Sequence, residues 1–297
     1  MQNSKGLKVN LLRTKIPYLF LLPGIMLVLA FNFIPFIDTL ILSFKNSKLI
    51  LPEERFAGFD NYQAVLTHSR FWYSLFITLS FAFVSISLEA ILGLCLGLMM
   101  NRLSPVNNFL RILILIPWTI PTVVTAKIWQ WMFDYNLGIL NYLFEVAGIH
   151  QINWLGKPFL AFFSLVIADV WKTAPFVAVI VLAGLSAIPQ EICKASVVDG
   201  ANSWQRFRFI TLPLLLPILS VAILFRAIDA LRIFDLVYVL TGGGPGGSTE
   251  TLSVYAYKLF FYKGDFGQGA ATSVIILFLV AGFGYFYTKK TFEMGNL

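Results

Sequence analysis

The sequence predicts an all-α, polytopic membrane protein with six transmembrane helices. Hydrophobic residues make up 58% of the 297-residue chain and charged residues only 12%, whereas about a quarter of a soluble domain is charged. The mean hydropathy is +0.78, and six apolar stretches each reach the ~20 residues that a membrane-spanning helix needs. Because lipid offers no hydrogen-bond partner to free backbone groups, we expect these stretches to be helical.

The predicted spans lie, in order, at about residues 17–43, 72–100, 109–132, 158–184, 212–234 and 270–288. Several exceed the minimum length, which allows a tilted helix or one that extends beyond the bilayer. The first span follows a basic segment, as the apolar part of a signal peptide does. It is much longer than a signal's apolar core, however, and no small-residue cleavage site follows it. We therefore expect it to be retained.

The placement of Lys and Arg predicts the orientation, because these residues accumulate in cytoplasmic segments. One set of polar segments carries eleven basic residues (Lys5, Lys8, Arg13, Lys15, Arg102, Arg111, Lys194, Arg206, Arg208, Lys289, Lys290) against three acidic ones (Glu191, Asp199, Glu293). The alternate set carries seven basic residues (Lys45, Lys48, Arg55, Arg70, Lys157, Lys258, Lys263) against seven acidic ones (Glu53, Glu54, Asp60, Asp134, Glu145, Glu250, Asp265). Both termini are therefore expected in the cytoplasm. The net charge of +7 reflects topology, and no nucleic-acid partner is predicted.

The polar segment between the fourth and fifth spans, at about residues 186–213, is predicted to form two short helices broken at a glycine. Pro189 starts the first helix, Asp199 and Gly200 end it, and Asn202 or Ser203 caps the second. Such a segment, exposed to water between two spans, is typical of a docking element for a soluble partner. The alternative is an ordinary connector stabilised by its own amphipathic helices.

This segment resembles the cytoplasmic coupling loop of the permease subunits of binding-protein-dependent ABC importers, in the carbohydrate branch. The likeness lies in Pro189, the core Ala195-x-x-x-Asp199-Gly200-Ala201, Phe207 and the exit Ile210-Thr211-Leu212-Pro213. It extends over about residues 16–292 through Phe59-Asp60-Asn61-Tyr62, Ile116-Pro117-Trp118-Thr119-Ile120-Pro121, Trp171-Lys172-Thr173-Ala174-Pro175, Phe234-Asp235 and the glycine run from Thr241 to Pro245.

One departure concerns the start of the core, where the family usually has Glu-Ala-Ala and this chain has Lys194, Ala195 and Ser196. The contact that the glutamate usually makes cannot be transferred to Lys194. The ATPase-coupling residues that the resemblance implies, with Lys194 included by its position alone, are the following: Glu191, Ile192, Lys194, Ala195, Ser196, Val198, Asp199, Gly200, Ala201 and Pro213. Ile192, Val197 and Val198 are the expected apolar anchors.

The resemblance further implies the fold of a type I ABC importer permease in a bacterial plasma (inner) membrane. A six-span permease domain at residues 16–292 would lie between cytoplasmic tails at residues 1–15 and 293–297. The implied partners are a homologous second permease subunit, two cytoplasmic ATPase subunits, an extracytoplasmic solute-binding protein and a sugar, either a di- or oligosaccharide or a sugar-based osmolyte. This chain would bind no cofactor, because ATP and Mg are bound by the ATPase subunits. It would transport by alternating access.

Ionisable residues inside spans are costly, so each is a candidate for function. Asp169 and Lys172 lie three residues apart in the fourth span and can pair along one helix. In the fifth span Arg226, Asp229, Arg232 and Asp235 recur at the same spacing, so that the series turns about 60° per step. Glu89 and Lys127, in the second and third spans, are weaker candidates.

The hypothesis is that part of this set lines a water-filled path and hydrogen-bonds a polyhydroxylated solute. Trp171, Phe234 and Tyr238 could then stack on the apolar faces of sugar rings. The alternative is that the charges neutralise one another and fix helix packing or subunit contacts. The resemblance favours the region from Arg226 to Asp235, because the later spans often supply sugar contacts in this family.

No catalytic or metal-binding constellation is predicted, because both histidines, His68 and His150, fall in external segments and neither Cys95 nor Cys193 has a partner at metal-ligand spacing. The glycine-rich run Thr241–Glu250 is expected to be a flexible external loop. It lacks the Gly-Lys-Ser/Thr ending of a phosphate-binding loop.

Two further expectations concern packing and mechanism. The glycines at 93 and 97, and those at 282 and 284, are expected to allow close helix approach. The alternative function is an ion-coupled secondary transporter whose intramembrane charges serve as ion sites. Such transporters often contain inverted repeats, but no repeat is visible here, and the docking segment would have no explanation.

Overall fold

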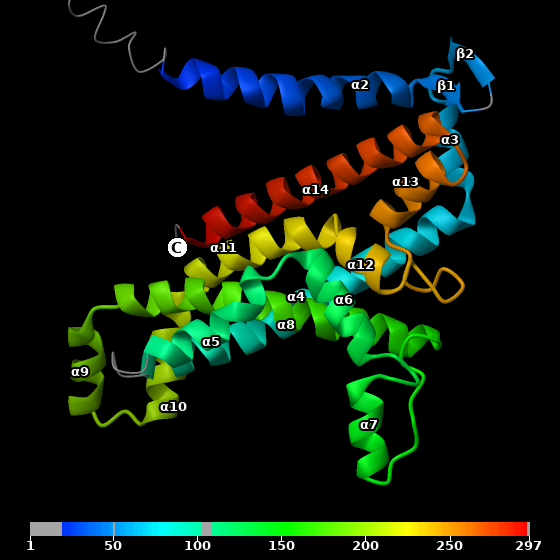
Figure 1. The fold of residues 1–297 in the computed structure, drawn as a ribbon. Helices are drawn as coiled ribbons and strands as arrows, with labels where there is room; N and C mark the ends of the chain where they lie inside the picture. Colours follow the sequence, from blue (N-terminus) through cyan, green and yellow to red (C-terminus); the bar gives the residue numbers. More distant parts are fainter. Residues whose placement is uncertain (1–19, 50, 103–107, 296–297) are drawn as a thin grey trace, which may run out of the picture. The chain divides into compact units, whose positions relative to one another are not determined.

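The computed structural model describes residues 20–49, 51–102 and 108–295 and is built almost entirely of helices (Figure 1). Within these residues, five helices are long and apolar enough to cross a membrane, and a bent pair of shorter helices makes six if the pair counts as one span. The all-α prediction is confirmed. The predicted tail at residues 1–15 and the end of the tail at 293–297 lie outside the described residues. The chain separates into two compact units, residues 1–67 with 259–274, and residues 68–258 with 275–297.

The first unit contains the N-terminal spanning helix, which runs from Phe20 to Ser43. It includes the π-helical turn η1 (Leu29–Phe33) and α2 (Ile34–Ser43), and is followed by β1 (Lys45–Lys48), β2 (Leu51–Phe56) and α3 (Asp60–Thr67). The two strands form an antiparallel hairpin that the sequence did not predict. The side-chain amide of Asn61 donates to the carbonyls of Ser43 (2.9 Å) and Lys45 (2.8 Å), which fixes the junction between helix and hairpin.

Proline explains why two of the long helices contain a π-helical turn. In η1 the amide of Ile34 donates to Leu29 O, and Pro35 comes next in the chain. In η3 (Phe207–Thr211) the amide of Leu212 donates to Phe207 O, and Pro213 comes next. A proline ring inside a helix clashes with the carbonyl four residues earlier, and a wider turn relieves that clash without ending the helix.

The second unit is organised around the long helices α4 (Ser69–Arg102) and α8 (Pro158–Ala187). A Cβ added at Gly93 would lie 2.5 Å from Val177 Cβ, and one added at Gly97 would lie 2.6 Å from Val181 Cγ1. The two helices therefore approach closely along these glycines, as predicted. A Cβ at Gly282 or Gly284 would meet no atom within 4 Å, so the described residues show no close helix packing there.

The predicted third span is broken into α5 (Asn108–Thr119) and α6 (Thr122–Met132), which are bent by 94°. Pro121 occupies the N-cap of α6, with φ of −54° and ψ of 140°, which is outside the helical region. A proline also disfavours helical geometry at the residue before it. The break at residues 120–121 follows from this, and the sequence prediction of one continuous helix over 109–132 is corrected accordingly.

The remaining elements of this unit complete the frame around the site. They are α7 (Ile139–Val146), α9 (Gln190–Val198), α10 (Ser203–Arg206), η3, α11 (Leu212–Leu231), α12 (Asp235–Leu240), the start of α13 (Leu252–Phe261) and the later part of α14 (Phe266–Gly295). The predicted sixth span lies within α14. Fully buried Phe81, Leu165 and Leu236 belong to one hydrophobic core that joins α4, α8 and α12. Packing of this core holds the charged residues described next at fixed positions.

Candidate functional site

Three ionisable side chains from three spanning helices meet inside the second unit. The Arg226 guanidinium of α11 donates through Nε to Glu89 Oε2 (2.5 Å) and through Nη2 to Glu89 Oε1 (2.9 Å). The same Nη2 donates to Asp169 Oδ2 (3.1 Å) of α8. The hydroxyl of Ser85, one turn before Glu89 on α4, lies 3.0 Å from Glu89 Oε1 and 2.6 Å from Asp169 Oδ2, so its single proton can be donated to either carboxylate. We call Glu89, Asp169 and Arg226 the buried triad.

Burial explains why these groups are joined. Glu89 is 0% exposed, Asp169 4% and Arg226 7%. An unpaired charge in such surroundings is very costly, whereas a paired and hydrogen-bonded one is tolerated. In the described part of the chain the carboxylate of Asp169 is bound by Ser85 and Arg226. Lys172, which the spacing allowed as a partner, forms no hydrogen bond or close ion pair with Asp169 among the described residues, although both line the cleft described below.

Sequence reasoning left Glu89 out of the candidate site, although it makes the bidentate contact with Arg226. The signal available in the sequence was the cost of an intramembrane carboxylate, which requires a partner of opposite charge. Spacing along one helix could not find that partner, because Glu89 and Arg226 lie on different helices.

A cleft of about 430 Å³ opens beside the triad, between the middle of α8, the end of α11 and the start of α12. Its charged lining residues are Asp169, Lys172, Arg226, Asp229, Arg232 and Asp235, and we call it the charged cleft. Asp229 approaches Arg226 at 3.9 Å and accepts a hydrogen bond from Arg232 at 2.8 Å. These two pairings at a spacing of three are those that the sequence allows.

The charged series does not continue along one helix as predicted. α11 ends at Leu231, and Arg232 lies at its C-cap with φ of −111° and ψ of 17°. Asp235 begins α12, a separate helix. The break turns the series from a helical stripe into the wall of a cleft. Donors and acceptors therefore face one space instead of spreading around a helix.

Of the three aromatic candidates, Phe234 lines the charged cleft, whereas Trp171 and Tyr238 are not among its described lining residues. The ring of Phe234 stacks on that of Tyr238, with centroids 5.2 Å apart and planes at 14°, and Tyr257 packs against both. Trp171 instead packs edge-on against Trp129, at 5.7 Å. Of the three candidates, Phe234 is thus the one placed to meet a solute in this cleft, and Trp118, which was not a candidate, also lines it.

The glycine-rich run Thr241–Glu250 is tied down, contrary to the prediction of a flexible loop. The Thr249 hydroxyl donates to Gly244 O (2.7 Å) and bonds with the Thr241 hydroxyl (2.8 Å). Glu250 is 1% exposed and accepts hydrogen bonds from Arg70 (2.6 and 2.7 Å) and Lys258 (2.6 Å). Burial alone would raise the pKa of Glu250, but the hydrogen bonds from Arg70 and Lys258 outweigh it and hold that pKa below its ordinary value.

The segment at residues 186–213, called the coupling loop below, has the predicted form of two helices broken at a glycine. Pro189 is the N-cap of α9 and Asp199 its C-cap, and Gly200 follows with φ of +79°, a left-handed conformation that favours glycine. Asn202 caps α10: its side chain accepts from the Gln205 amide while the Gln205 side chain accepts from the Asn202 amide. Figure 1 shows α9 and α10 beyond the ends of α8 and α11.

Most of the predicted coupling residues are exposed in this chain. Ile192 is 42% exposed and Val198 87%, so both apolar residues are accessible to a partner. Glu191, Lys194, Ala195, Asp199 and Pro213 are exposed too, and Ala201 is half-buried. Ser196 is the exception at 6%, because its hydroxyl turns back to donate to Cys193 O (2.7 Å). The sequence did not show that α10 continues through η3 into α11 as one helix, Ser203–Leu231.

The family assignment rests on a model that matches residues 89–290, a range that contains the buried triad, the charged cleft and the coupling loop. That model describes the binding-protein-dependent transport system inner membrane component. The chain belongs to this family. It is a multi-pass inner-membrane permease subunit of an ABC importer and a non-catalytic transport component, and the ATPase is a separate subunit. This confirms the prediction of an importer subunit over the ion-coupled alternative, which nothing in the comparisons supports.

Similar permeases serve sugar systems. The trehalose/maltose transport system permease protein MalF of Thermococcus litoralis is 45% identical over 97% of this chain and 98% of its own length. The trehalose transport system permease protein SugA of Mycobacterium tuberculosis is 36% identical over 93% and 88%. The diacetylchitobiose uptake system permease protein DasB of Streptomyces coelicolor is 34% identical over 92% and 85%. These likenesses extend over nearly all of this permease.

A solved structure supports the fold independently. A chain of a bacterial ABC transporter involved in the import of the acidic polysaccharide alginate matches this permease with a TM-score of 0.85. The match covers 97% of this chain and 98% of that one at 22% sequence identity. The ABC importer permease fold that the resemblance implied is therefore confirmed.

Proposed function

We propose that this permease forms half of the translocation path of an ATP-driven importer for a di- or oligosaccharide or a sugar-based osmolyte. The names of the similar permeases support a sugar substrate. The observation that carries the proposal is the charged cleft, where Lys172 and Arg232 offer donors beside the acceptors of Asp229 and Asp235. A sugar hydroxyl both donates and accepts, and a lining of mixed charge satisfies both roles.

The charged cleft can release its solute because part of its charge is already paired within the chain. Asp229 has Arg226 and Arg232 as partners when no solute is present. Solute hydroxyls thus compete with existing interactions. The free energy of binding is the small difference between the interactions gained with the solute and those lost within the cleft. Phe234 adds an apolar face beside these groups. Weak, reversible contact of this kind suits a path through which solute must pass.

The proposed partners would act on the two sides of the membrane. A solute-binding protein would deliver the sugar on the extracytoplasmic side, and a homologous second permease would complete the path. Two ATPase subunits, which bind ATP and Mg, would dock on the coupling loop from the cytoplasm, where both termini of this permease would also lie. The exposed side chains of Ile192, Val197 and Val198 support such docking, since they are apolar and accessible in this chain.

The substrate proposal is tested by sugar uptake in proteoliposomes that hold the assembled importer and its binding protein. We expect uptake to need ATP and to survive the collapse of ion gradients by ionophores. Asp229→Asn should lower the apparent affinity for sugar by about tenfold or more, because a hydrogen bond to a charged group is worth about 1.5–3 kcal/mol. Asp38→Asn, the same change at a residue of another span that is not among the described lining residues of the cleft, is the control. Normal uptake and selectivity in Asp229→Asn would exclude it from the path.

The coupling proposal is tested by a matched pair of glycine substitutions. Gly200 and Gly148 both have positive φ, +79° and +74°, and neither has an atom within 4 Å of a built Cβ. Gly200→Trp should prevent co-purification of the ATPase, whereas Gly148→Trp, next to α7, should leave the complex intact. Both variants should insert into the membrane normally. A Gly200→Trp variant that retains the ATPase and transports sugar would refute docking at this loop.

A further inference from the structure

A second cleft lies where the coupling loop meets the ends of two spanning helices. It has a volume of about 900 Å³ and lies between the last turns of α4, the end of α8, and α9, α10 and η3. Among its fifteen described lining residues two are arginines, Arg102 and Arg206, and none is acidic. We call it the basic cleft. It shares no lining residue with the charged cleft.

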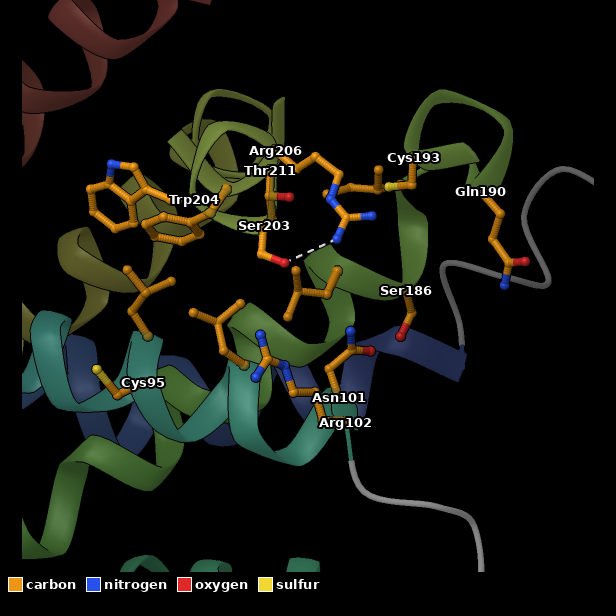
Figure 2. A pocket seen from close by; sticks show the side chains of 15 residues that line it. Cys95, Asn101, Arg102, Ser186, Gln190, Cys193, Ser203, Trp204, Arg206 and Thr211 are labelled. Carbon is orange, nitrogen blue, oxygen red and sulfur yellow. Dashed lines mark hydrogen bonds between the residues drawn. The ribbon is translucent and has the colours of Figure 1, made fainter. Parts of the chain in front are cut away.

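The polar groups of the basic cleft are hydrogen-bond donors in an arrangement that suits an anion. Figure 2 shows Arg206 entering from the α10 side and Arg102 from the end of α4, with Asn101 beside it. Arg206 Nη2 donates to Ser203 Oγ at 3.1 Å, and among the described residues no further hydrogen-bond partner engages its guanidinium. Guanidinium groups bind carboxylate and phosphate oxygens through two parallel N–H donors, so a phosphoryl group is an anion that these two arginines can bind.

The other wall of the basic cleft is apolar and consists of Leu94, Leu98, Leu185 and Ile188. On α4 the leucines precede Asn101 and Arg102, so the lining changes from apolar to basic toward the helix end. The helix has 34 residues and at 1.5 Å per residue is about 50 Å long, against a hydrocarbon core of about 30 Å. The change therefore falls where a spanning helix leaves the lipid. Trp204, 69% exposed at the rim, is typical of that interface.

We propose that the basic cleft binds the phosphate-bearing head group of an anionic phospholipid, with an acyl chain along the leucine wall. A free phosphate would satisfy the arginines but would leave that apolar wall unused. Basic pockets between spanning helices bind the head groups of anionic lipids by this combination of charge and apolar contact. Because Gln190 and Cys193 of α9 also line the cleft, a bound lipid would contact the coupling loop directly. The proposal does not depend on the identity of the transported solute.

The test measures lipid retained by the assembled importer in nanodiscs of phosphatidylcholine with and without phosphatidylglycerol, read by native mass spectrometry. We expect selective retention of phosphatidylglycerol. Each arginine near a membrane surface contributes about fivefold in binding to anionic lipid, so Arg102→Gln and Arg206→Gln should each reduce retention by about that factor. Arg206→Lys, which keeps the charge, should retain more lipid than Arg206→Gln. Arg208→Gln, an exposed arginine two residues away that does not line the cleft, is the matched control.

A second measurement separates lipid from free phosphate. Cys95 lines the cleft and is exposed, so in a Cys193→Ser background its alkylation by a maleimide reports occupancy. Phosphatidylglycerol should slow labelling in the parent background and not after Arg102→Gln. Protection by inorganic phosphate alone would overturn the assignment to lipid. Equal retention of both lipids, or loss of retention in Arg208→Gln as large as in Arg206→Gln, would overturn the site itself.

Discussion

The buried triad permits a quantitative prediction about which charge the fold needs most. Two carboxyl groups, Glu89 and Asp169, share the single guanidinium of Arg226, and all three side chains are at least nine-tenths buried. Arg226→Gln leaves two carboxylates facing each other in an apolar core, with no cation between them. Glu89→Gln leaves one carboxylate with one guanidinium. Glu89→Gln keeps the size of the side chain and Arg226→Gln also shortens it, and the electrostatic consequences of the two changes are opposite.

The expected magnitude follows from the burial. Removing one partner from a buried ion pair costs about 3–5 kcal/mol, because the remaining charge is uncompensated. At about 2–4 °C per kcal/mol for a large domain, Arg226→Gln should lower the melting temperature by about 6–20 °C. Glu89→Gln should lower it clearly less, since the contact between Arg226 and Asp169 at 3.1 Å remains. Arg232→Gln, at a 63% exposed arginine paired with Asp229, should cost at most about 1 kcal/mol.

The measurement is thermal unfolding of the purified complex in detergent, followed by intrinsic fluorescence and by the loss of monodisperse protein. The order of the melting temperatures of the variants tests the argument. If Glu89→Gln is as destabilising as Arg226→Gln, the argument from excess carboxylate fails. If Arg226→Gln melts within about 2 °C of the wild type, the triad does not hold α4, α8 and α11 together.

Three further predictions concern the frame of the site. Glu250 has a pKa below its ordinary value, so its contribution to stability is present above that ordinary value and is lost as pH falls through the lower, folded-state pKa. The melting temperature should therefore fall at acid pH, and it should fall less in Glu250→Gln. An equal fall in both proteins would contradict the reasoning. Gly97→Ala should destabilise the chain by about 1–3 kcal/mol through overpacking against Val181, and Val181→Ala should restore part of it; no rescue in the double variant would refute close packing there. Asn202→Ala should cost about 1 kcal/mol of stability by removing the cap of α10. The loss should appear as weaker protection of the α10 amides against hydrogen exchange. Equal protection in both proteins would show that the cap does not stabilise the helix.

The sequence predicted those parts of the structure that depend on local chemistry. Pro189, Gly200 and Asn202 each impose a backbone geometry or a cap by themselves, so the two helices of the coupling loop could be placed before any contact was known. Gly93 and Gly97 similarly indicated where another helix comes close. The same kind of local reasoning explains the break in the third span, because Pro121 was visible in the sequence. There the apolar pattern, which continues across the proline, hid a 94° bend.

The sequence could not predict the parts that depend on contacts between helices. The sequence offered Lys172 as a possible partner of Asp169 because spacing along one helix is visible in a sequence, whereas Arg226 lies on another helix. The tightly bonded Thr241–Glu250 segment was missed for a related reason. Its glycines suggested flexibility, but Arg70 and Lys258, distant from Glu250 in sequence, fix it in place. Burial and long-range charge pairing decided both cases.

One continuous helix connects the coupling loop to the charged cleft, so it can transmit movement from one to the other. The helix from Ser203 to Leu231 begins in the coupling loop and ends at the charged cleft, and it carries Arg226 and Asp229 on its last turns. Hydrogen bonds along a helix resist stretching, so displacement of its first turn by a docked ATPase must move these two residues or bend the helix at η3. Because Arg226 is bound to Glu89 on α4 and Asp169 on α8, that movement would strain the buried triad. Asp229 is shared between Arg226 and Arg232. A change at the triad would therefore alter the donors and acceptors offered to solute, which couples the state of the loop to affinity in the cleft.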